Sequence, residues 1–319
     1  MKKTAIILAL IILTVSIISC SAPATPADIS IIGLKGPTGM GMAKLMEDFA
    51  NGETDNNYTF TLTSAPDEVS AEVIKGTVNI AAVPINLAGV LYQKTEGAIQ
   101  IAAINTLGVL YILENGNEIN SINDLEGKTI YATGQGSTTE YILNYILQKN
   151  NINAEVIFKN EHSELVTFMA AGEIVLGMLP EPHVTTALNQ NADLRIALDL
   201  TEEWNKIAGD DSTLLQGCII VNKKFAEENK SALDNFLAEY KASIEYANAN
   251  VADVSLLIEK HEIIPKAALA EKALPNCNIT YIDGDLMKQY VNAVYQVFYD
   301  ANPSSIGGEM PDDGFYYRP

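Results

Sequence analysis

Four short turns hold the residues of this sequence that could contact a small polar ligand. Two of the turns place glycine beside hydroxyl side chains, and two follow a proline that ends an apolar run. Glycine lets the backbone approach a ligand closely, and a serine or threonine hydroxyl both donates and accepts hydrogen bonds. The candidate ligand-binding residues in these turns are Thr38, Gly39, Asn86, Gly136, Ser137, Thr138, Thr139, Glu181 and His183.

Each of these residues also has an ordinary structural explanation. A serine or threonine before a helix can simply cap it, and capping and ligand binding at one helix start are compatible. Asn86 could be a turn residue, and Glu181 could be a solvated loop carboxylate beside a packing His183. If Glu181 does face a ligand, its carboxylate favours an amine or amidine donor and disfavours a bare anion.

The sequence offers little material for catalysis or metal binding. Its three histidines are His162, His183 and His261, and no nucleophile with a neighbouring base can be named. Neither a Cys-x-x-Cys nor a His-x-x-x-His spacing occurs, so we expect no metal and no cofactor. The two arginines are Arg195, in a surface stretch, and Arg318, next to last. An amino-acid ligand, which a bidentate arginine would typically hold, is therefore disfavoured.

Two runs of alternating strands and helices position the four turns. The predicted strands cover residues 29–34, 58–62, 78–83, 129–132, 154–158 and 174–179, and the predicted helices end near 50, 75, 148 and 171. Gly36 and Gly134 are 98 positions apart, and Pro84 and Pro180 are 96 apart, which indicates two similar lobes. In open α/β sheets, ligands bind beyond the carboxyl ends of the strands, where helix starts present backbone N–H groups. All four turns have this position.

Beyond residue 204 the pattern changes to one strand and a series of amphipathic helices. The strand is predicted at 214–221, and the helices at 225–250, 251–261, 266–274 and 285–301. A chain that crosses into a second lobe and returns would complete its first lobe with these elements. We therefore expect an α/β fold of two similar lobes with mainly parallel sheets flanked by helices, joined by a hinge of two crossings. Lobe 1 is expected to comprise residues 28–112 and 218–319, and lobe 2 residues 113–217.

The N-terminus has the pattern of an export signal. Lys2 and Lys3 precede an apolar run over residues 5–18, which at 14 residues is shorter than the roughly 20 needed to span a bilayer. Residues 17–20, Ile-Ile-Ser-Cys, resemble a bacterial lipobox, in which the cysteine is lipidated and becomes the first residue. We expect a signal peptide over 1–19, a lipid on Cys20 and a flexible tether over 20–27. An ordinary signal that merely contains a cysteine is the alternative.

The net charge and the cysteine content indicate which partners the protein can have and which disulfide it could form. The 319 residues suit two domains, and 40 acidic against 20 basic residues give a net charge of −20. Such a surface repels phosphate backbones, so we expect no nucleic acid as a partner, and we expect a monomer. Cys218 and Cys277 could form a disulfide outside the cytoplasm or remain two buried thiols.

Taken together, these features resemble the solute-binding proteins of bacterial ABC transporters. The lipobox, the paired lobes, the Asp-Leu-x-Gly-Lys stretch at 124–128 and the Gly136-Ser137 helix start are similar to the type II group that serves nitrate, sulfonates, taurine and thiamine-pyrimidine precursors. The resemblance covers essentially the whole mature chain. It implies a type II periplasmic-binding-protein fold, a lipid-anchored position on the extracytoplasmic face, a small-molecule solute and a membrane permease as partner. Because members bind different solutes, it does not identify the ligand.

Two other classes of function stay open. Enzymes that share this fold make the thiamine pyrimidine or act in menaquinone formation, but they are generally cytoplasmic, whereas this chain carries an export signal. We therefore expect no enzymatic activity. A sensory or surface lipoprotein that uses the lobes to regulate a partner is also compatible with the sequence. For the solute-binding protein, the expected mechanism is hinge closure around the ligand.

Overall fold

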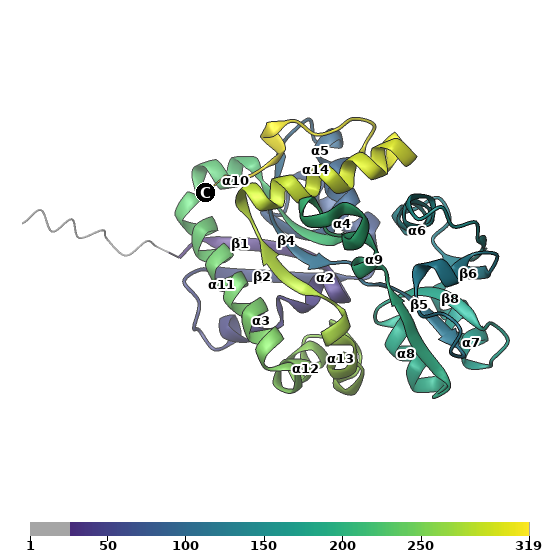
Figure 1. Cartoon of the computed structure of the whole chain (residues 1–319). Helices are drawn as coiled ribbons and strands as arrows, with labels where there is room; N and C mark the ends of the chain where they lie inside the picture. The colour runs from purple at the N-terminus through teal and green to yellow at the C-terminus, as the bar shows by residue number, and fades with distance from the viewer. Residues whose placement is uncertain (1–25, 319) are drawn as a thin grey trace, which may run out of the picture.

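A computed structural model describes residues 26–318 and shows two lobes, each built around its own β-sheet (Figure 1). The expected signal peptide over 1–19, the lipidated Cys20 and residues 20–25 of the tether lie outside the described residues. Within residues 26–318, no helix is long and apolar enough to cross a membrane.

Lobe 1 contains a six-stranded sheet in the order β11-β4-β10-β3-β1-β2. Its strands are β1 (Asp28–Leu34), β2 (Asn57–Thr63), β3 (Ile80–Pro84), β4 (Ile99–Leu107), β10 (Leu215–Asn222) and β11 (Ile279–Ile282). Successive side chains of a strand point to opposite faces, and both faces are buried here. In β1, Ile29 and Ile31 pack with helices α3, α10 and α11, whereas Ile32 and Leu34 pack with α4, α5 and α14.

The helices of lobe 1 cover both faces of this sheet (Figure 1). They are α2 (Pro37–Met40), α3 (Ala43–Ala50), α4 (Pro66–Lys75), α5 (Ile85–Lys94), α10 (Lys223–Glu228), α11 (Lys230–Ala249), α12 (Val251–Lys260), α13 (Ala267–Ala273) and α14 (Gly284–Ala301). The single helix predicted up to residue 50 is broken into α2 and α3 at Gly41. A Cβ on Gly41 would lie 2.8 Å from the Ile244 side chain, so the glycine lets α11 approach this break.

Lobe 2 contains a five-stranded sheet in the order β7-β6-β8-β5-β9. Its strands are β5 (Leu110–Asn115), β6 (Thr129–Thr133), β7 (Glu155–Lys159), β8 (Leu176–Pro180) and β9 (Leu194–Asp199). Its helices are α6 (Thr138–Lys149), α7 (His162–Ala170), α8 (His183–Gln190) and α9 (Leu200–Ala208). All six strands predicted for the two runs are present, and β4, β5, β9 and β11 are additions that the sequence pattern did not separate.

The two sheets repeat one pattern, which confirms the expected pair of similar lobes. The order β2-β1-β3-β10-β4 in lobe 1 corresponds to β7-β6-β8-β5-β9 in lobe 2. In both sets the first three strands are parallel, the fourth is antiparallel to its neighbours and the fifth restores the direction. Four of the five shared strands therefore run the same way, and the mainly parallel α/β architecture is confirmed.

The reversed strand of each sheet is the one that arrives from the other lobe. The chain leaves β4 at Leu107 and enters β5 at Leu110, and it returns through residues 212–214 into β10. The parallel strands of each sheet end at the edge next to the other lobe. A strand that enters the sheet from that edge must therefore be antiparallel to them. The expected lobe boundaries after residues 112 and 217 fall inside β5 and β10, because each arriving strand pairs soon after the crossing.

Both cysteines of the folded part are buried free thiols. Cys218 lies in β10 and Cys277 just after the 3-10 turn η4 (Leu274–Asn276). Burial raises the pKa of each thiol, so the reactive thiolate is disfavoured. The disulfide that the sequence left open is therefore absent from this structure.

We predict that neither thiol reacts with a chromogenic disulfide reagent while the protein is folded. In a form that begins at Ser21, absorbance should show no thiol release under native conditions and release of both thiols in denaturant. Rapid native reaction, or no reaction after unfolding without reductant, would contradict the buried free-thiol assignment.

Candidate functional site

The carboxyl edges of the two sheets face each other at the junction of the lobes. The chain passes directly from the carboxyl end of β4 into β5, so this edge of lobe 1 borders lobe 2. In lobe 1 the edge carries the starts of α2 and α5, and in lobe 2 it carries the starts of α6, α7 and α8. The predicted site residues are divided between these helix starts.

In lobe 1, Thr38 and the turn after β3 are brought together around Gly217. Gly217 pairs with Pro84, and a Cβ on Gly217 would lie 3.1 Å from Thr38 Oγ1 and 2.6 Å from Asn105 Oδ1. Asn105 Nδ2 donates to the Thr38 carbonyl at 3.1 Å, which holds the first turn of α2 against the sheet. Thr38 is 8% exposed, so its side chain is buried beside this network.

The two other lobe 1 candidates are positioned by backbone constraints. A Cβ on Gly39 would lie 2.5 Å from the Leu34 carbonyl oxygen, so only glycine fits at this point of the turn. Asn86 is half-buried in the first turn of α5, where its Nδ2 donates weakly to the Ser305 carbonyl at 3.5 Å. Asn86 is therefore directed partly toward the C-terminal segment of lobe 1.

In lobe 2, the start of α6 leaves backbone N–H groups available. Gly134 and Gly136 have φ near +78° and +74°, a conformation that favours glycine, and they fold the turn. The Ser137 hydroxyl donates back to the Gly134 carbonyl instead of capping the helix. The N–H groups of Thr138, Thr139 and Glu140 are the first of the helix and have no partner within it.

Glu181 is buried at the start of α8, at 3% exposure, and links the two lobes. Its carboxylate accepts hydrogen bonds from the Thr185 hydroxyl at 2.9 Å, the Thr185 N–H at 3.2 Å and Asn276 Nδ2 of lobe 1 at 3.1 Å. Burial raises the pKa of Glu181, and these donors oppose the shift. The sequence left open whether Glu181 is a solvated loop carboxylate. Its burial and its three hydrogen bonds exclude that interpretation.

His183 lies beside a second histidine that sequence reasoning did not place in the site. The His162 and His183 ring centroids are 4.8 Å apart, and His162 Nδ1 is 2.6 Å from the Thr133 hydroxyl. Burial lowers the pKa of both imidazoles, and His162 contributes to lowering that of His183 to about 4. Both rings are thus neutral near pH 7. Because His162 begins the helix after β7, the strand-end rule that selected His183 would also have found it.

A small set of polar contacts joins the lobes elsewhere. The Tyr111 hydroxyl of lobe 2 donates to the Asn276 carbonyl at 2.8 Å, and Asn278 Nδ2 donates to the Gly108 carbonyl at 2.7 Å. On another side of the junction, Asn302 Nδ2 donates to the Tyr141 hydroxyl at 2.9 Å. These asparagines occupy irregular segments, and no sequence pattern distinguishes them from ordinary turn residues.

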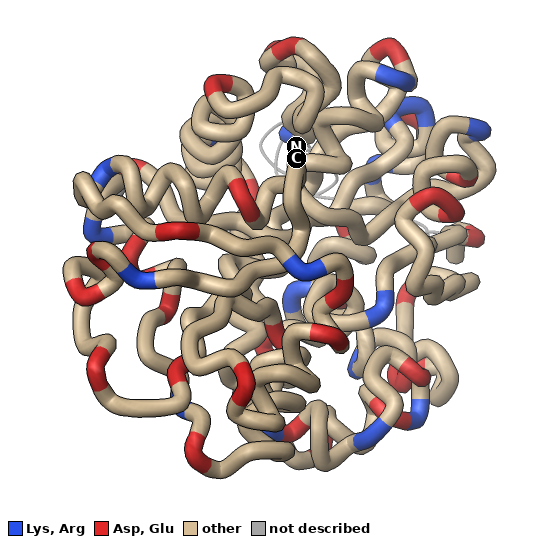
Figure 2. Tube along the Cα trace, turned by 90° about the vertical axis from the view of Figure 1, so that its right-hand side faces the viewer, with Lys and Arg blue, Asp and Glu red and all other residues tan. Residues whose placement is uncertain are grey.

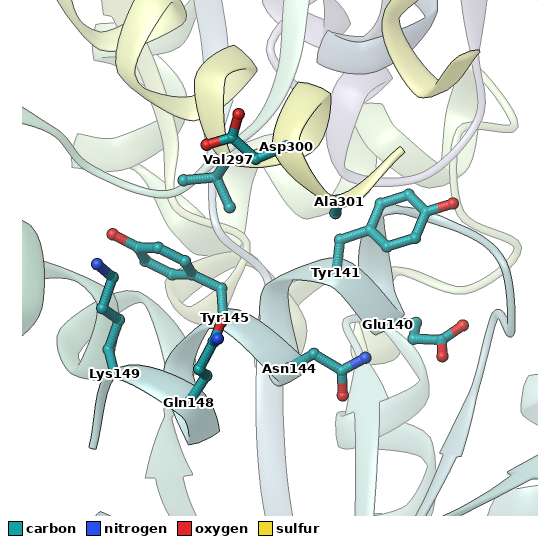
Figure 3. Close-up of a pocket in the computed structure, with 9 residues that line it drawn as sticks. All are labelled: Glu140, Tyr141, Asn144, Tyr145, Gln148, Lys149, Val297, Asp300 and Ala301. Carbon is teal, nitrogen blue, oxygen red and sulfur yellow. The ribbon is translucent and has the colours of Figure 1, made fainter. Parts of the chain in front are cut away.

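A cavity of about 610 Å³ lies between α6 of lobe 2 and the end of α14 of lobe 1 (Figure 3). Figure 3 shows Tyr141 and Tyr145 projecting from α6 toward α14. The cavity is lined by Glu140, Tyr141, Asn144, Tyr145, Gln148, Lys149, Val297, Asp300 and Ala301. Its walls belong to different lobes, so its width depends on how far the lobes are closed. Its volume is in the range of small-molecule sites.

The charges near the facing edges do not form an arginine clamp. Arg195 Nη2 contacts Glu114 at 2.6 Å, and Arg195 Nε donates to the Gly116 carbonyl at 3.0 Å. Glu114 lies near the end of the reversed strand β5, which places this ion pair at the opposite edge of the lobe 2 sheet. Viewed from the lobe 2 side, acidic residues are spread along the Cα trace (Figure 2). Within residues 26–318, no three metal-ligating side chains are grouped to hold a metal ion.

Comparisons with known proteins match both the sequence and the fold. A family model described as menaquinone biosynthesis matches residues 40–297, and no curated protein matches the sequence. An ABC transporter protein from Parabacteroides distasonis superposes with a TM-score of 0.76 at 23% identity, covering 92% of this chain and 99% of that one. The periplasmic aliphatic sulphonate-binding protein SsuA from Escherichia coli gives 0.70 at 14% identity, covering 92% and 93%. At these identities the superpositions establish the periplasmic-binding-protein fold, as expected from the sequence.

We predict that His183 makes the protein less stable in acid. Its pKa is about 4 when folded against 6.5 for an ordinary histidine, so protons bind preferentially to the unfolded chain between these values. The stability that neutral His183 provides is complete above about pH 6.5 and is lost as the pH falls toward 4. Urea unfolding at pH 7.5 and 5.0 should show a smaller acid-induced loss for His183→Asn than for the wild type. Equal losses would contradict the assignment.

Proposed function

The chain belongs to the family described as menaquinone biosynthesis, and we propose that it functions as a solute-binding protein that delivers a small polar solute to an ABC importer. The observation that carries this proposal is the pair of similar lobes, joined by two crossings, with helix starts on both facing edges. A solute that contacts both edges favours the closed arrangement over the open one, because only the closed form provides both sets of contacts.

The proposed binding residues come from both lobes. They are Thr38, Gly39 and Asn86 in lobe 1, and Gly136, Ser137, Thr138, Thr139, Glu181 and His183 in lobe 2. The backbone N–H groups of Thr138 and Thr139, which have no partner within α6, support a role for the start of this helix, and the position of Thr38 in the first turn of α2 at the facing edge supports a role for lobe 1. Glu181 contributes through closure, since its contact with Asn276 joins the lobes.

The location that we propose is the extracytoplasmic face of a membrane. The lipobox-like residues 17–20 and the small, proline-rich residues 21–27 support a lipid on Cys20 and a short tether to lobe 1. The structural relatives named as sulphonate-binding and ABC-transporter proteins support a soluble ligand and a permease as partners. We further propose that the protein acts as a monomer.

We predict that removing one hydroxyl from either lobe weakens solute binding without unfolding the protein. Thr38→Val and Ser137→Ala each delete a hydrogen-bonding group, which should weaken affinity about tenfold for a solute that uses it. A thermal-shift screen of small polar solutes identifies a ligand, because a ligand that binds only the folded state raises its melting temperature. Calorimetry then compares the variants.

Thr129→Val is the matched control, because Thr129 begins β6 at the opposite edge of lobe 2 and bonds only Glu155 among the described side chains. This control should bind as the wild type does. Unchanged affinity in both Thr38→Val and Ser137→Ala would show that the solute does not occupy the facing edges. Failure of every solute class to raise the melting temperature would count against solute binding itself.

An enzyme on the same scaffold is the second candidate, and one specific contact favours it. Thr133, His162 and His183 form a chain of hydroxyl and neutral imidazoles at the edge of lobe 2, and neutral imidazole can accept a proton from a bound substrate. The family description points in the same direction. For a solute-binding protein, mass spectrometry should recover the bound compound unchanged after prolonged incubation. Conversion that His162→Asn abolishes would establish the enzyme instead.

A further inference from the structure

A glutamate lies within or just before the first turn of each of α6, α7 and α8, the helices that start at the facing edge of lobe 2. We propose that lobe 2 binds an uncharged or cationic nitrogen group of the solute, such as an amine, an amidine or an aminoheterocycle, and disfavours oxyanions. This inference rests on the proposed solute-binding function and specifies the chemical class of its ligand. It separates the protein from structural relatives that are named for sulphonates.

Three glutamates lie at the starts of α6, α7 and α8. Glu140 accepts the Gly136 N–H at 2.6 Å, and Glu164 accepts the Asn160 N–H at 3.3 Å. Glu181 accepts the Thr185 N–H at 3.2 Å. The positive end of a helix dipole corresponds to about half a charge, so a carboxylate of the chain at each end offsets the attraction that an anionic ligand would find there.

Few positive charges compensate these carboxylates. Lys159 ends β7 and forms an ion pair with Glu164 at 3.7 Å, with its ammonium 4.5 Å from the centre of the Phe168 ring. Among the described residues, Glu140 and Glu181 have no such ion pair. Arg195 is paired with Glu114 at the far edge of the sheet. Because burial lowers the pKa of His162 and His183, neither imidazole supplies a positive charge near neutral pH.

The groups that remain near this edge include several acceptors for an N–H donor. A neutral imidazole has one nitrogen that accepts a hydrogen bond, and a carboxylate only accepts. The cavity beside α6 is also more acidic than basic. Glu140 and Asp300 lie on its two walls, and Lys149 is the one ammonium among its lining residues (Figure 3). Tyr141 and Tyr145 also line it, and their rings suit a planar or cationic group.

A direct test compares two classes of probe on the full-length protein in detergent. The nitrogen probes are 4-aminopyrimidine, benzamidine and butylamine, and the oxyanion probes are nitrate and 1-butanesulfonate. Binding is followed by the fluorescence of Trp204, the one tryptophan of the chain, whose ring centre is 4.7 Å from that of Tyr145 in the cavity wall. Calorimetry provides an independent affinity.

The variants Glu140→Gln and Glu181→Gln remove one carboxylate each. Both should weaken binding of a nitrogen probe about tenfold and strengthen binding of an oxyanion, because each variant removes a carboxylate that repels the oxyanion. Glu173→Gln is the matched control, since Glu173 is exposed in the turn before β8, at the opposite edge of lobe 2. Glu140 is only half-buried, whereas removal of the buried Glu181 carboxylate could prevent folding. In that case Glu140→Gln alone tests the inference.

The outcomes separate this inference from the proposed function. Binding of a nitrogen probe, weakened by Glu140→Gln and unchanged by Glu173→Gln, supports both. Binding of nitrate or 1-butanesulfonate to the wild type, with no response to the nitrogen probes, overturns the assignment of ligand class and leaves the solute-binding function standing. Absence of binding by either class, together with no response in the wider solute screen, contradicts both.

Discussion

Within residues 26–318 the chain passes between its two lobes only twice, and the relative movement of the lobes depends on this constraint. Because β5 and β10 each join a sheet immediately after crossing, each lobe has its own sheet, and the junction combines apolar packing that continues from lobe 1 into lobe 2 with polar contacts between the lobes. The contacts of Asn276 with Tyr111 and Glu181 are among them. A typical hydrogen bond contributes only about 1 kcal/mol net, so the polar contacts by themselves add a modest cost to opening of the lobes. A solute held by both edges can therefore decide which arrangement is populated.

This arrangement also explains why one fold serves proteins that are named for transport and a family that is described by a biosynthetic pathway. Enclosure between two lobes excludes water and positions a small molecule, which benefits both capture and chemistry. The side chains at the facing edges determine whether such a protein only captures its ligand or also converts it. Here the edge of lobe 2 combines three glutamates with two neutral histidines, so in the site that we propose the same groups would determine both the charge of the ligand and the possibility of proton transfer.

The sequence predicted the repeated lobes because their strands are buried on both faces and end at turns with glycine or proline. The steady offset between Gly36 and Gly134 and between Pro84 and Pro180 corresponds to matching strands in the two sheets. The crossing at Gly108 was harder to predict. The segment from Ile99 to Leu113 is apolar almost throughout, so its pattern does not show where β4 ends and β5 begins. Sequence position alone could not reveal that Glu181 is buried against Asn276, since the two residues are 95 positions apart and meet only when the lobes do.

Closure of the lobes around a solute is measured most directly by a distance between the two lobes. Val175 of lobe 2 and Leu286 of lobe 1 are 57% and 46% exposed, so cysteines placed there accept spin labels while the buried native thiols remain unlabelled. Pulsed electron paramagnetic resonance on a form that begins at Ser21 would compare the free protein with the protein saturated by a solute from the screen. We predict a shorter and narrower distance distribution in the bound state. An identical distribution, with binding verified by calorimetry on the same labelled sample, would contradict it.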